Sequence, residues 1–149
     1  MRYFLDTEFN GFGGALLSLA LVPEDGEEFY AVLDCDDPIH PWVAQNVIPY
    51  LANVPVGLVA PRLSRDSAAN AMAAYLAHDP APEIVADWPD DIAYFNQLLL
   101  IGPGLMVAVH DLTFRLISLP GFSTAENSAV PHNALHDARA LRDHLLALE

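Results

Sequence analysis

The sequence predicts an α/β protein in which helices flank one mixed sheet of five strands. Three observations lead to this expectation: three short apolar runs near the start, an alternation of helices and strands after them, and an amphipathic helix at the end. Strands that come first and then alternate with helices are typical of a sheet with helices packed on its faces. The 149 residues show no internal repeat, low-complexity tract or linker, so we expect one domain over residues 1–149.

The first three strands are expected at residues 3–9, 16–22 and 29–34. The second and third are joined by PEDGEE, whose Asp25-Gly26 pair is a strong hairpin signal. We therefore expect these three strands to run antiparallel, each beside the next.

The rest of the chain predicts helices and strands in alternation. Ser64 is a suitable N-cap for the second helix. Residues 120–132 form the longest irregular stretch, and long loops of this kind are often functional. The last helix, entered through Pro131, has an apolar stripe that should face inward. The expected helices are 40–51, 64–78, 91–100 and 132–149, the strands 82–87 and one within 102–110, and the stripe is Ala134, Leu135, Ala138, Leu141, Leu145 and Leu148.

The charge balance limits how the protein can bind other molecules. Twenty acidic residues face six basic ones, all arginine, which gives a net charge of −14. A long basic surface for nucleic acid is excluded, so a polyanionic substrate would be held over a short piece, with metal ions supplying positive charge. No segment approaches the roughly 20 apolar residues of a membrane span. Acids early in the chain and a single cysteine, Cys35, lead us to expect a cytoplasmic protein.

Two carboxylates close the first strand in the sequence DTEFNG. Asp6 and Glu8 are separated only by Thr7, so both point to the same face of the strand. Like charges this close repel unless a cation lies between them or one keeps its proton.

Two further parts of the chain offer carboxylates to the same place. Asp91 opens the helix after the fourth strand, which we expect beside the first, and Asp137 leans toward the inward stripe of the last helix. Oxygen ligands suit Mg²⁺ or Mn²⁺, and four carboxylates can hold two such ions. His132, five residues before Asp137, is a candidate general base.

These motifs carry a family resemblance. Three features resemble the motifs of the DEDDh 3′-5′ exonuclease superfamily: DTEF, the Asp that opens a helix after the fourth strand, and HNALHD. The order of the motifs and the H-x₄-D spacing both match that superfamily. That superfamily has a ribonuclease H-like fold. The segments MRYFLDTEF, PEDGEEFYAV and HPWVAQNVIPYL are similar to a small bacterial branch that contains the single-domain exoribonuclease preferring adenylate-rich RNA.

The resemblance implies a complete site and a substrate. Asp6, Glu8, Asp91 and Asp137 would hold two Mg²⁺ ions, which Mn²⁺ can replace, and His132 would be the general base. The substrate would be the 3′ end of single-stranded nucleic acid, with nucleoside 5′-monophosphates released. RNA is favoured, but the sequence does not fix RNA over DNA, because contacts to the 2′-hydroxyl cannot be located in it. Relatives often pair, so a homodimer is expected.

Some assignments stay open at this point. Many relatives have Asn where this chain has Asp87, so metal ligation lies between Asp87, Asp90 and Asp91; we favour Asp91, with Asp87 as a neighbouring group. Phe9, Phe12 and Trp88 are candidates for stacking on the terminal base, and packing in the core is the alternative for each.

Two other functions also remain. One is a ribonuclease H-like endonuclease that cuts within a duplex, and the other is an inactive interaction module of the same fold. The H-x₄-D position of His132 favours the exonuclease, and the missing basic face disfavours binding of a duplex.

Overall fold

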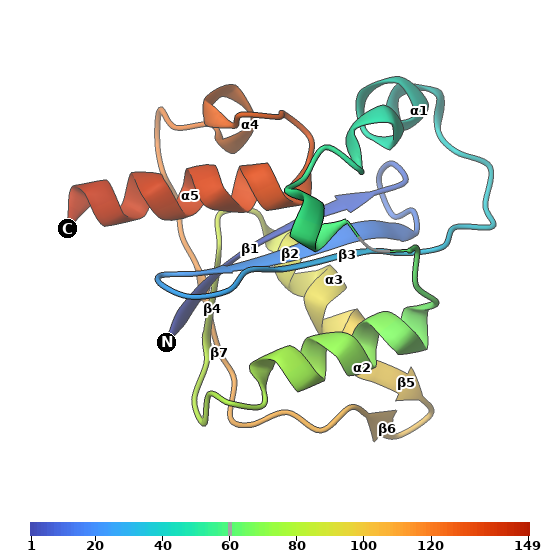
Figure 1. The fold of residues 1–149 in the computed structure, drawn as a ribbon, viewed down its shortest axis with the longest axis horizontal. Coiled ribbons are helices and arrows are strands. Elements are labelled where there is room, and N and C mark those ends of the chain that lie inside the picture. Colours follow the sequence, from blue (N-terminus) through green and yellow to red (C-terminus); the bar gives the residue numbers. More distant parts are fainter. Residues whose placement is uncertain (60) are drawn as a thin grey trace.

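One five-stranded mixed sheet lies at the centre of the protein (Figure 1). The structure, a computed structural model, describes residues 1–59 and 61–149. The strand order is β3-β2-β1-β4-β7, with β1, β2 and β3 antiparallel and β4 and β7 joined in parallel. This confirms the predicted fold class and its ribonuclease H-like arrangement. The strands are β1 Arg2–Phe9, β2 Leu16–Pro23, β3 Phe29–Val32, β4 Glu83–Ala86 and β7 Thr113–Leu116.

Helices cover both faces of the sheet, and the alternation of side chains along β1 shows which face meets which helix. Tyr3 and Leu5 pack with α2 (Arg65–Leu76) and α3 (Pro89–Leu99). Phe4 packs on the other face against α5 (Ala134–Leu148) (Figure 1). Since successive strand residues alternate between faces, Asp6 and Glu8 share the α5 face and Thr7 faces α3.

Four short elements lie over the α5 side of the sheet or beside it. The helix expected at 40–51 is split into α1 (Pro41–Asn46) and the 3₁₀ turn η1 (Ile48–Tyr50), followed by η2 (Val56–Leu58). Pro49 has no N–H to continue an α-helical bond, which suits the change to a 3₁₀ turn. A one-turn helix, α4 (Thr124–Asn127), interrupts the stretch expected to be irregular.

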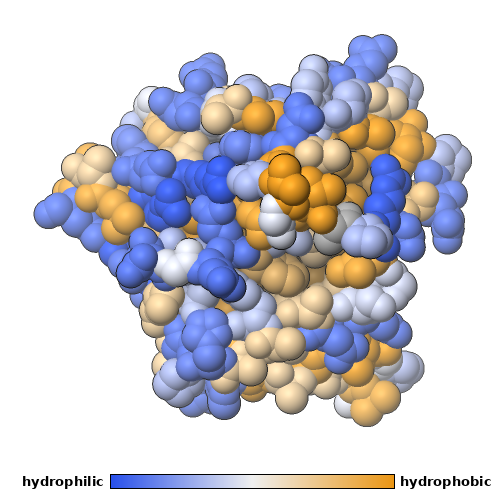
Figure 2. Space-filling view, viewed as in Figure 1, coloured by the Kyte–Doolittle hydropathy of each residue, from blue (hydrophilic) through white to orange (hydrophobic). Residues whose placement is uncertain are grey.

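A strand does form within 102–110, but the expectation that it completes the main sheet was wrong. Residues 100–106 form a separate hairpin, β5 (Leu100–Gly102) with β6 (Leu105–Met106), which turns at Gly104 with φ 68°. The place beside β4 is taken instead by β7. The apolar run at 102–110 suggested a strand of the main sheet, but the hairpin is largely exposed, with Leu105 61% exposed. Apolar side chains show there at the lower right of Figure 2.

The apolar stripe of the last helix was right except at its end. Ala134, Leu135, Ala138 and Leu141 are buried, whereas Leu148 is 66% exposed because α5 runs past the edge of its core cluster. Among the helices in the described residues, none is both long and apolar enough to cross a membrane.

Candidate metal-binding site

The first two carboxylates come from the end of β1. Asp6 and Glu8 lie opposite Ala20 and Ser18 of β2, and a register shift between Glu8 and Phe9 follows them. Both side chains are half-buried. The end of the strand thus presents two acids to the face that α5 covers.

Asp91 joins α3 to β1 at this point. Its Oδ1 accepts hydrogen bonds from the Thr7 backbone N–H at 3.0 Å and from Thr7 Oγ1 at 2.6 Å, and the residue is only 2% exposed. The position follows from the chain path: β4 lies parallel to β1, and Pro89 begins α3 directly after it, which puts Asp91 in the first helical turn. A carboxylate there also interacts favourably with the helix dipole.

The start of α5 is held by its N-cap residue. Asn133 is fully buried, and its Oδ1 accepts from the backbone N–H groups of Leu135 and His136. Its Nδ2 donates to the carbonyl oxygen of Tyr50 at 2.9 Å. These bonds tie the first turn of α5 to the η1 segment and so fix Asp137, which is 4% exposed.

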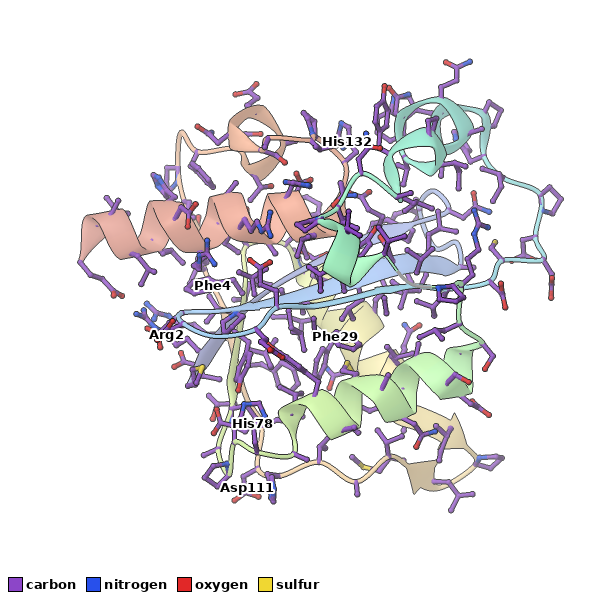
Figure 3. All side chains as sticks on the ribbon, in the orientation of Figure 1. Arg2, Phe4, Phe29, His78, Asp111 and His132 are labelled. Carbon is purple, nitrogen blue, oxygen red and sulfur yellow. The ribbon has the colours of Figure 1, made fainter. Side chains whose placement is uncertain are left out.

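His132 precedes this cap in an uncommon backbone conformation. Its φ of 60° is positive, a region that residues other than glycine rarely occupy and that costs about 1–3 kcal/mol. Its backbone N–H donates to Asp137 Oδ2 at 3.2 Å, and its ring meets the Trp42 ring edge-on at 5.0 Å between centroids. The residue lies at the start of α5, toward α1 (Figure 3).

Burial raises the pKa of all four carboxylates, and the charges of the other site carboxylates raise those of Asp6 and Glu8 further. Burial raises the pKa of Asp6 well above its ordinary value, and the charges of Asp91, Glu8 and Asp137 raise it further. Burial, followed by the charges of Asp137 and Asp91, raises the pKa of Glu8 to about 8. Burial raises the pKa of Asp91 to about 7 despite the Thr7 bonds, and burial also raises the pKa of Asp137. The four carboxylates therefore share one electrostatic environment and need protons or a cation near neutral pH.

The donor set fits a divalent cation. Glu8, His132 and Asp137 each offer one ligand atom, and these atoms lie within 4.8 Å of one another. Within the described part of the chain, Asp137 Oδ1 is buried and has no hydrogen-bond partner. A buried carboxylate oxygen without a donor is costly unless a cation meets it. Oxygen-rich ligand sets suit Mg²⁺ or Mn²⁺.

The cluster of close ligand atoms differs from the predicted ligand set in two ways. It contains His132, which we expected to act as a base, and it does not contain Asp6 or Asp91. Asp6 nevertheless responds to the charges of Asp91 and Asp137, so the acids of β1, α3 and α5 do gather at one end of the sheet.

The three acids near the start of α3, Asp87, Asp90 and Asp91, differ in burial and in hydrogen-bond partners. Asp90 Oδ2 accepts a hydrogen bond from Trp88 Nε1 at 3.1 Å. Asp87 is half-buried, and burial raises its pKa. Of the three, Asp91 makes the hydrogen bonds to Thr7 of β1, and its role as a metal ligand stays a prediction.

A hollow of about 250 Å³ opens beside Glu8. Phe9 and Phe12 line it, and so do His40 and Trp42, which the sequence analysis missed. Phe12 is 98% exposed, so the alternative that it packs in the core was wrong. Phe9 is half-buried, and its ring stacks on that of Tyr94 with 4.7 Å between the centroids.

Trp88 lies in a different hollow. It is 59% exposed, so the alternative that it packs in the core was wrong for this residue as well. It lines a groove of about 480 Å³ together with Asp87 and Phe122. The acidic site therefore has one aromatic hollow at Glu8 and another at Asp87.

Comparison with known proteins finds relatives that match part of the chain. No family model matches the chain. Two 3′-5′ exoribonucleases of Mycobacterium tuberculosis, MT2234.1 and Rv2179c, are each 47% identical to it over 55 residues. The match covers 34% of this chain and 33% of each relative, so it spans about a third of the curated proteins. The chain thus has partial-length homology to 3′-5′ exoribonucleases.

Proposed function

We propose that residues 1–149 form one metal-dependent 3′-5′ exonuclease domain, which hydrolyses single-stranded RNA to nucleoside 5′-monophosphates. The observation that carries the proposal is the meeting of acids from β1, α3 and α5. Burial raises the pKa of all four, and repulsion from the neighbouring carboxylates raises those of Asp6 and Glu8 further. The partial homology to exoribonucleases supports the reaction and the choice of RNA. The homodimer and the cytoplasmic location stay predictions.

The four carboxylates would hold the metal. Asp6, Glu8, Asp91 and Asp137 would bind two Mg²⁺ or Mn²⁺ ions, which lower the pKa of the attacking water and stabilise charge on the departing 3′-oxygen. Two of these acids are well fixed, since Asp91 accepts two bonds from Thr7 and Asp137 accepts one from His132. Ligands that are held in advance need little rearrangement when substrate binds.

His132 would accept the proton of the attacking water. The residue is half-buried, so it keeps some access to water, and Asp137 Oδ2 accepts a hydrogen bond from its backbone N–H. The contact with Trp42 restricts where the ring can move. A histidine ring can gain and lose a proton near neutral pH, which suits this step.

The hollow beside Glu8 would take the terminal base. Phe12 and Trp42 expose ring surface there, and stacking of a base on an aromatic ring contributes about 1–3 kcal/mol. Stacking tolerates different bases and requires no basic face. It therefore agrees with a net charge of −14, which allows contact with only a short piece of the strand.

The test is a time course on a 5′-labelled, adenylate-ended RNA in Mg²⁺ or EDTA. We expect a Mg²⁺-dependent ladder that shortens by one nucleotide at a time and is largely lost in His132→Ala. The matched control is His110→Ala, because His110 contacts the Ala77 carbonyl at the end of α2, on the other face of the sheet. This variant should keep the wild-type rate.

Other products would overturn the proposal. Internal fragments from an RNA–DNA hybrid would indicate the endonuclease. Intact RNA and DNA, with no Mg²⁺ binding by calorimetry, would indicate the interaction module. Asp6→Asn provides the second readout, since it should weaken Mg²⁺ binding at the site but leave an interaction module unchanged.

A further inference from the structure

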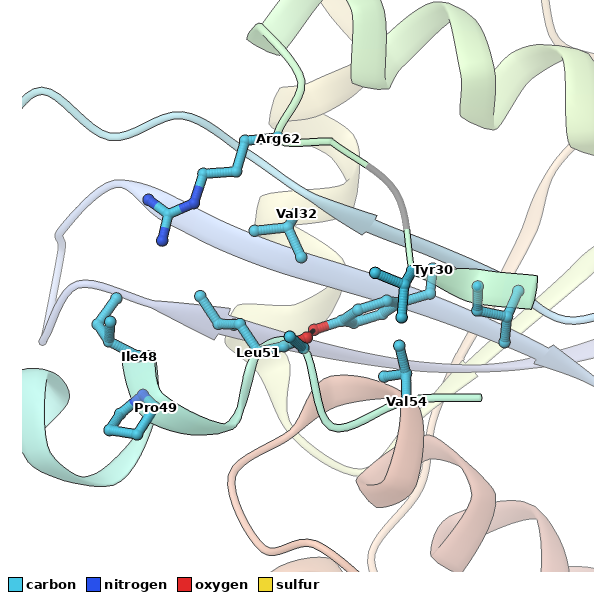
Figure 4. A pocket seen from close by; sticks show the side chains of 10 residues that line it. Tyr30, Val32, Ile48, Pro49, Leu51, Val54 and Arg62 are labelled. Atoms are coloured by element: carbon cyan, nitrogen blue, oxygen red, sulfur yellow. Dashed lines mark hydrogen bonds between the residues drawn. The ribbon is translucent and has the colours of Figure 1, made fainter. Parts of the chain in front are cut away.

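A third hollow lies between the edge strand β3 and the segment that carries η1 and η2 (Figure 4). It is on the same face of the sheet as the acidic site but two strands across, since Tyr30 lies opposite Ala20 and Ala20 lies opposite Asp6. Its volume is about 170 Å³, and nine of its ten lining residues are uncharged. Val32, Leu51 and Val54 supply apolar walls, and the Tyr30 ring lies among them. The Tyr30 hydroxyl is already used, since it donates to the Leu51 carbonyl at 2.9 Å. The lining side chains therefore favour hydrocarbon over a strongly polar group.

The charged residue of the lining is Arg62, whose side chain extends along the hollow in Figure 4. Arg62 is exposed and, within residues 1–59 and 61–149, makes neither an ion pair nor a hydrogen bond. The other five arginines each contact a carboxylate or a carbonyl oxygen: Arg2, Arg65, Arg115, Arg139 and Arg142. In a chain with 20 acidic residues, a guanidinium without a carboxylate beside an apolar hollow is an unusual combination.

We propose that this hollow binds a small amphipathic anion. Its hydrocarbon or aromatic body would lie against Val32, Leu51 and Val54, and its carboxylate would meet the Arg62 guanidinium. The size is suitable, because an apolar cavity of about 150 Å³ can hold one benzene molecule. A guanidinium binds a carboxylate through two parallel hydrogen bonds, so it fixes the orientation of the ligand as well as attracting it.

The wall of the hollow is connected to the start of α5. The Tyr50 carbonyl accepts from Asn133 Nδ2, and His136 Nε2 lies 2.8 Å from the Asn53 carbonyl. A ligand that shifts residues 48–54 should therefore change the surroundings of the Asn133 side-chain amide. That NMR signal gives a readout that does not depend on the proposed function or on bound metal.

The probe for the test is 4-methylbenzoate, titrated into ¹⁵N-labelled protein and followed by NMR. We expect saturable shifts of amide signals in β3 and residues 48–62, together with the side-chain amide of Asn133. The neutral analogue 4-methylbenzamide should bind about tenfold more weakly because it lacks the charge. Acetate, which has the charge but no apolar body, should give no saturable shift in the same concentration range.

Two variants separate the role of Arg62 from a general charge effect. Arg62→Met keeps the apolar stem and should weaken 4-methylbenzoate about tenfold while leaving 4-methylbenzamide unchanged. Arg115→Gln removes another exposed arginine and should leave both affinities at the wild-type value. Equal binding of 4-methylbenzoate to wild type and Arg62→Met, or shifts confined to other parts of the protein, would overturn the proposal.

Discussion

Replacing Asp91 with asparagine should stabilise the metal-free protein at alkaline pH while abolishing nuclease activity. Burial raises the pKa of Asp91 from 3.8 to about 7. A carboxyl with a raised pKa in the folded state supports folding below its pKa in the unfolded chain, and this contribution is lost as pH rises through the folded pKa. The ionised Asp91 therefore destabilises the metal-free fold most above about pH 7.

The size of the effect follows from this difference in pKa. About three pH units at about 1.4 kcal/mol each correspond to about 4 kcal/mol, an upper bound because neighbouring carboxylates share the protons. Asparagine is neutral, and its Oδ1 can still accept both Thr7 bonds. We expect Asp91→Asn to raise the free energy of unfolding by about 1–3 kcal/mol at about pH 8.5 in EDTA, and by less at pH 5.

Urea denaturation at the two pH values provides the assay. Asp36→Asn, which removes an exposed carboxylate, controls for the lower net charge and should change little. Asp91→Ala leaves Thr7 Oγ1 without its partner and should not give the same gain. Mg²⁺ should stabilise wild type at about pH 8.5 but not Asp91→Asn. A variant less stable than wild type in EDTA at that pH, or an equal gain from Asp36→Asn, would refute the reasoning.

Three further outcomes test the supports of the site. His132 has a positive φ, which glycine adopts more easily than alanine. In urea denaturation, His132→Gly should therefore have a free energy of unfolding about 1 kcal/mol higher than His132→Ala, and both variants should be inactive. Equal stabilities would show that the backbone at this position is not strained. Asn133→Ala should lose about 2–4 kcal/mol in thermal unfolding, because the helix cap and the bond to Tyr50 both disappear. Glu28→Gln should lose about 1–2 kcal/mol at low salt and less in 1 M NaCl, since Glu28 pairs with the half-buried Arg139; an equal loss at both salt concentrations would argue against the ion pair.

The sequence was sufficient for the part of the fold that local patterns determine. The three antiparallel strands follow from apolar runs and from the Asp25-Gly26 turn, and Ser64 caps α2 as expected. The last strand was misplaced because hydrophobicity alone cannot distinguish a buried strand from an exposed hairpin. The TFRL run of β7 is short and mostly exposed, so its signal was weaker than that of residues 102–110.

The sequence indicated which acids would gather, but not which contacts hold them in place. The order of the motifs indicated that the acids would meet. Nothing local to Asp91 indicates that Thr7, 84 residues away, would bind it twice. Likewise, Trp42 comes from a helix distant in sequence from Glu8, and the positive φ of His132 depends on how α5 is held rather than on the residue type.

The fold already supplies some positive potential to the acids, and its size shows why a cation is still needed. Asp91 and Asp137 occupy the first turns of α3 and α5, so two helix N-termini face the cluster. Each contributes about 0.3–1 kcal/mol, and up to about 2 kcal/mol where partly buried. The pKa of Asp91 remains at about 7 and that of Glu8 at about 8, so burial outweighs the helix ends. Full ionisation near neutral pH therefore requires a charge that the described residues lack, and divalent cations would provide it.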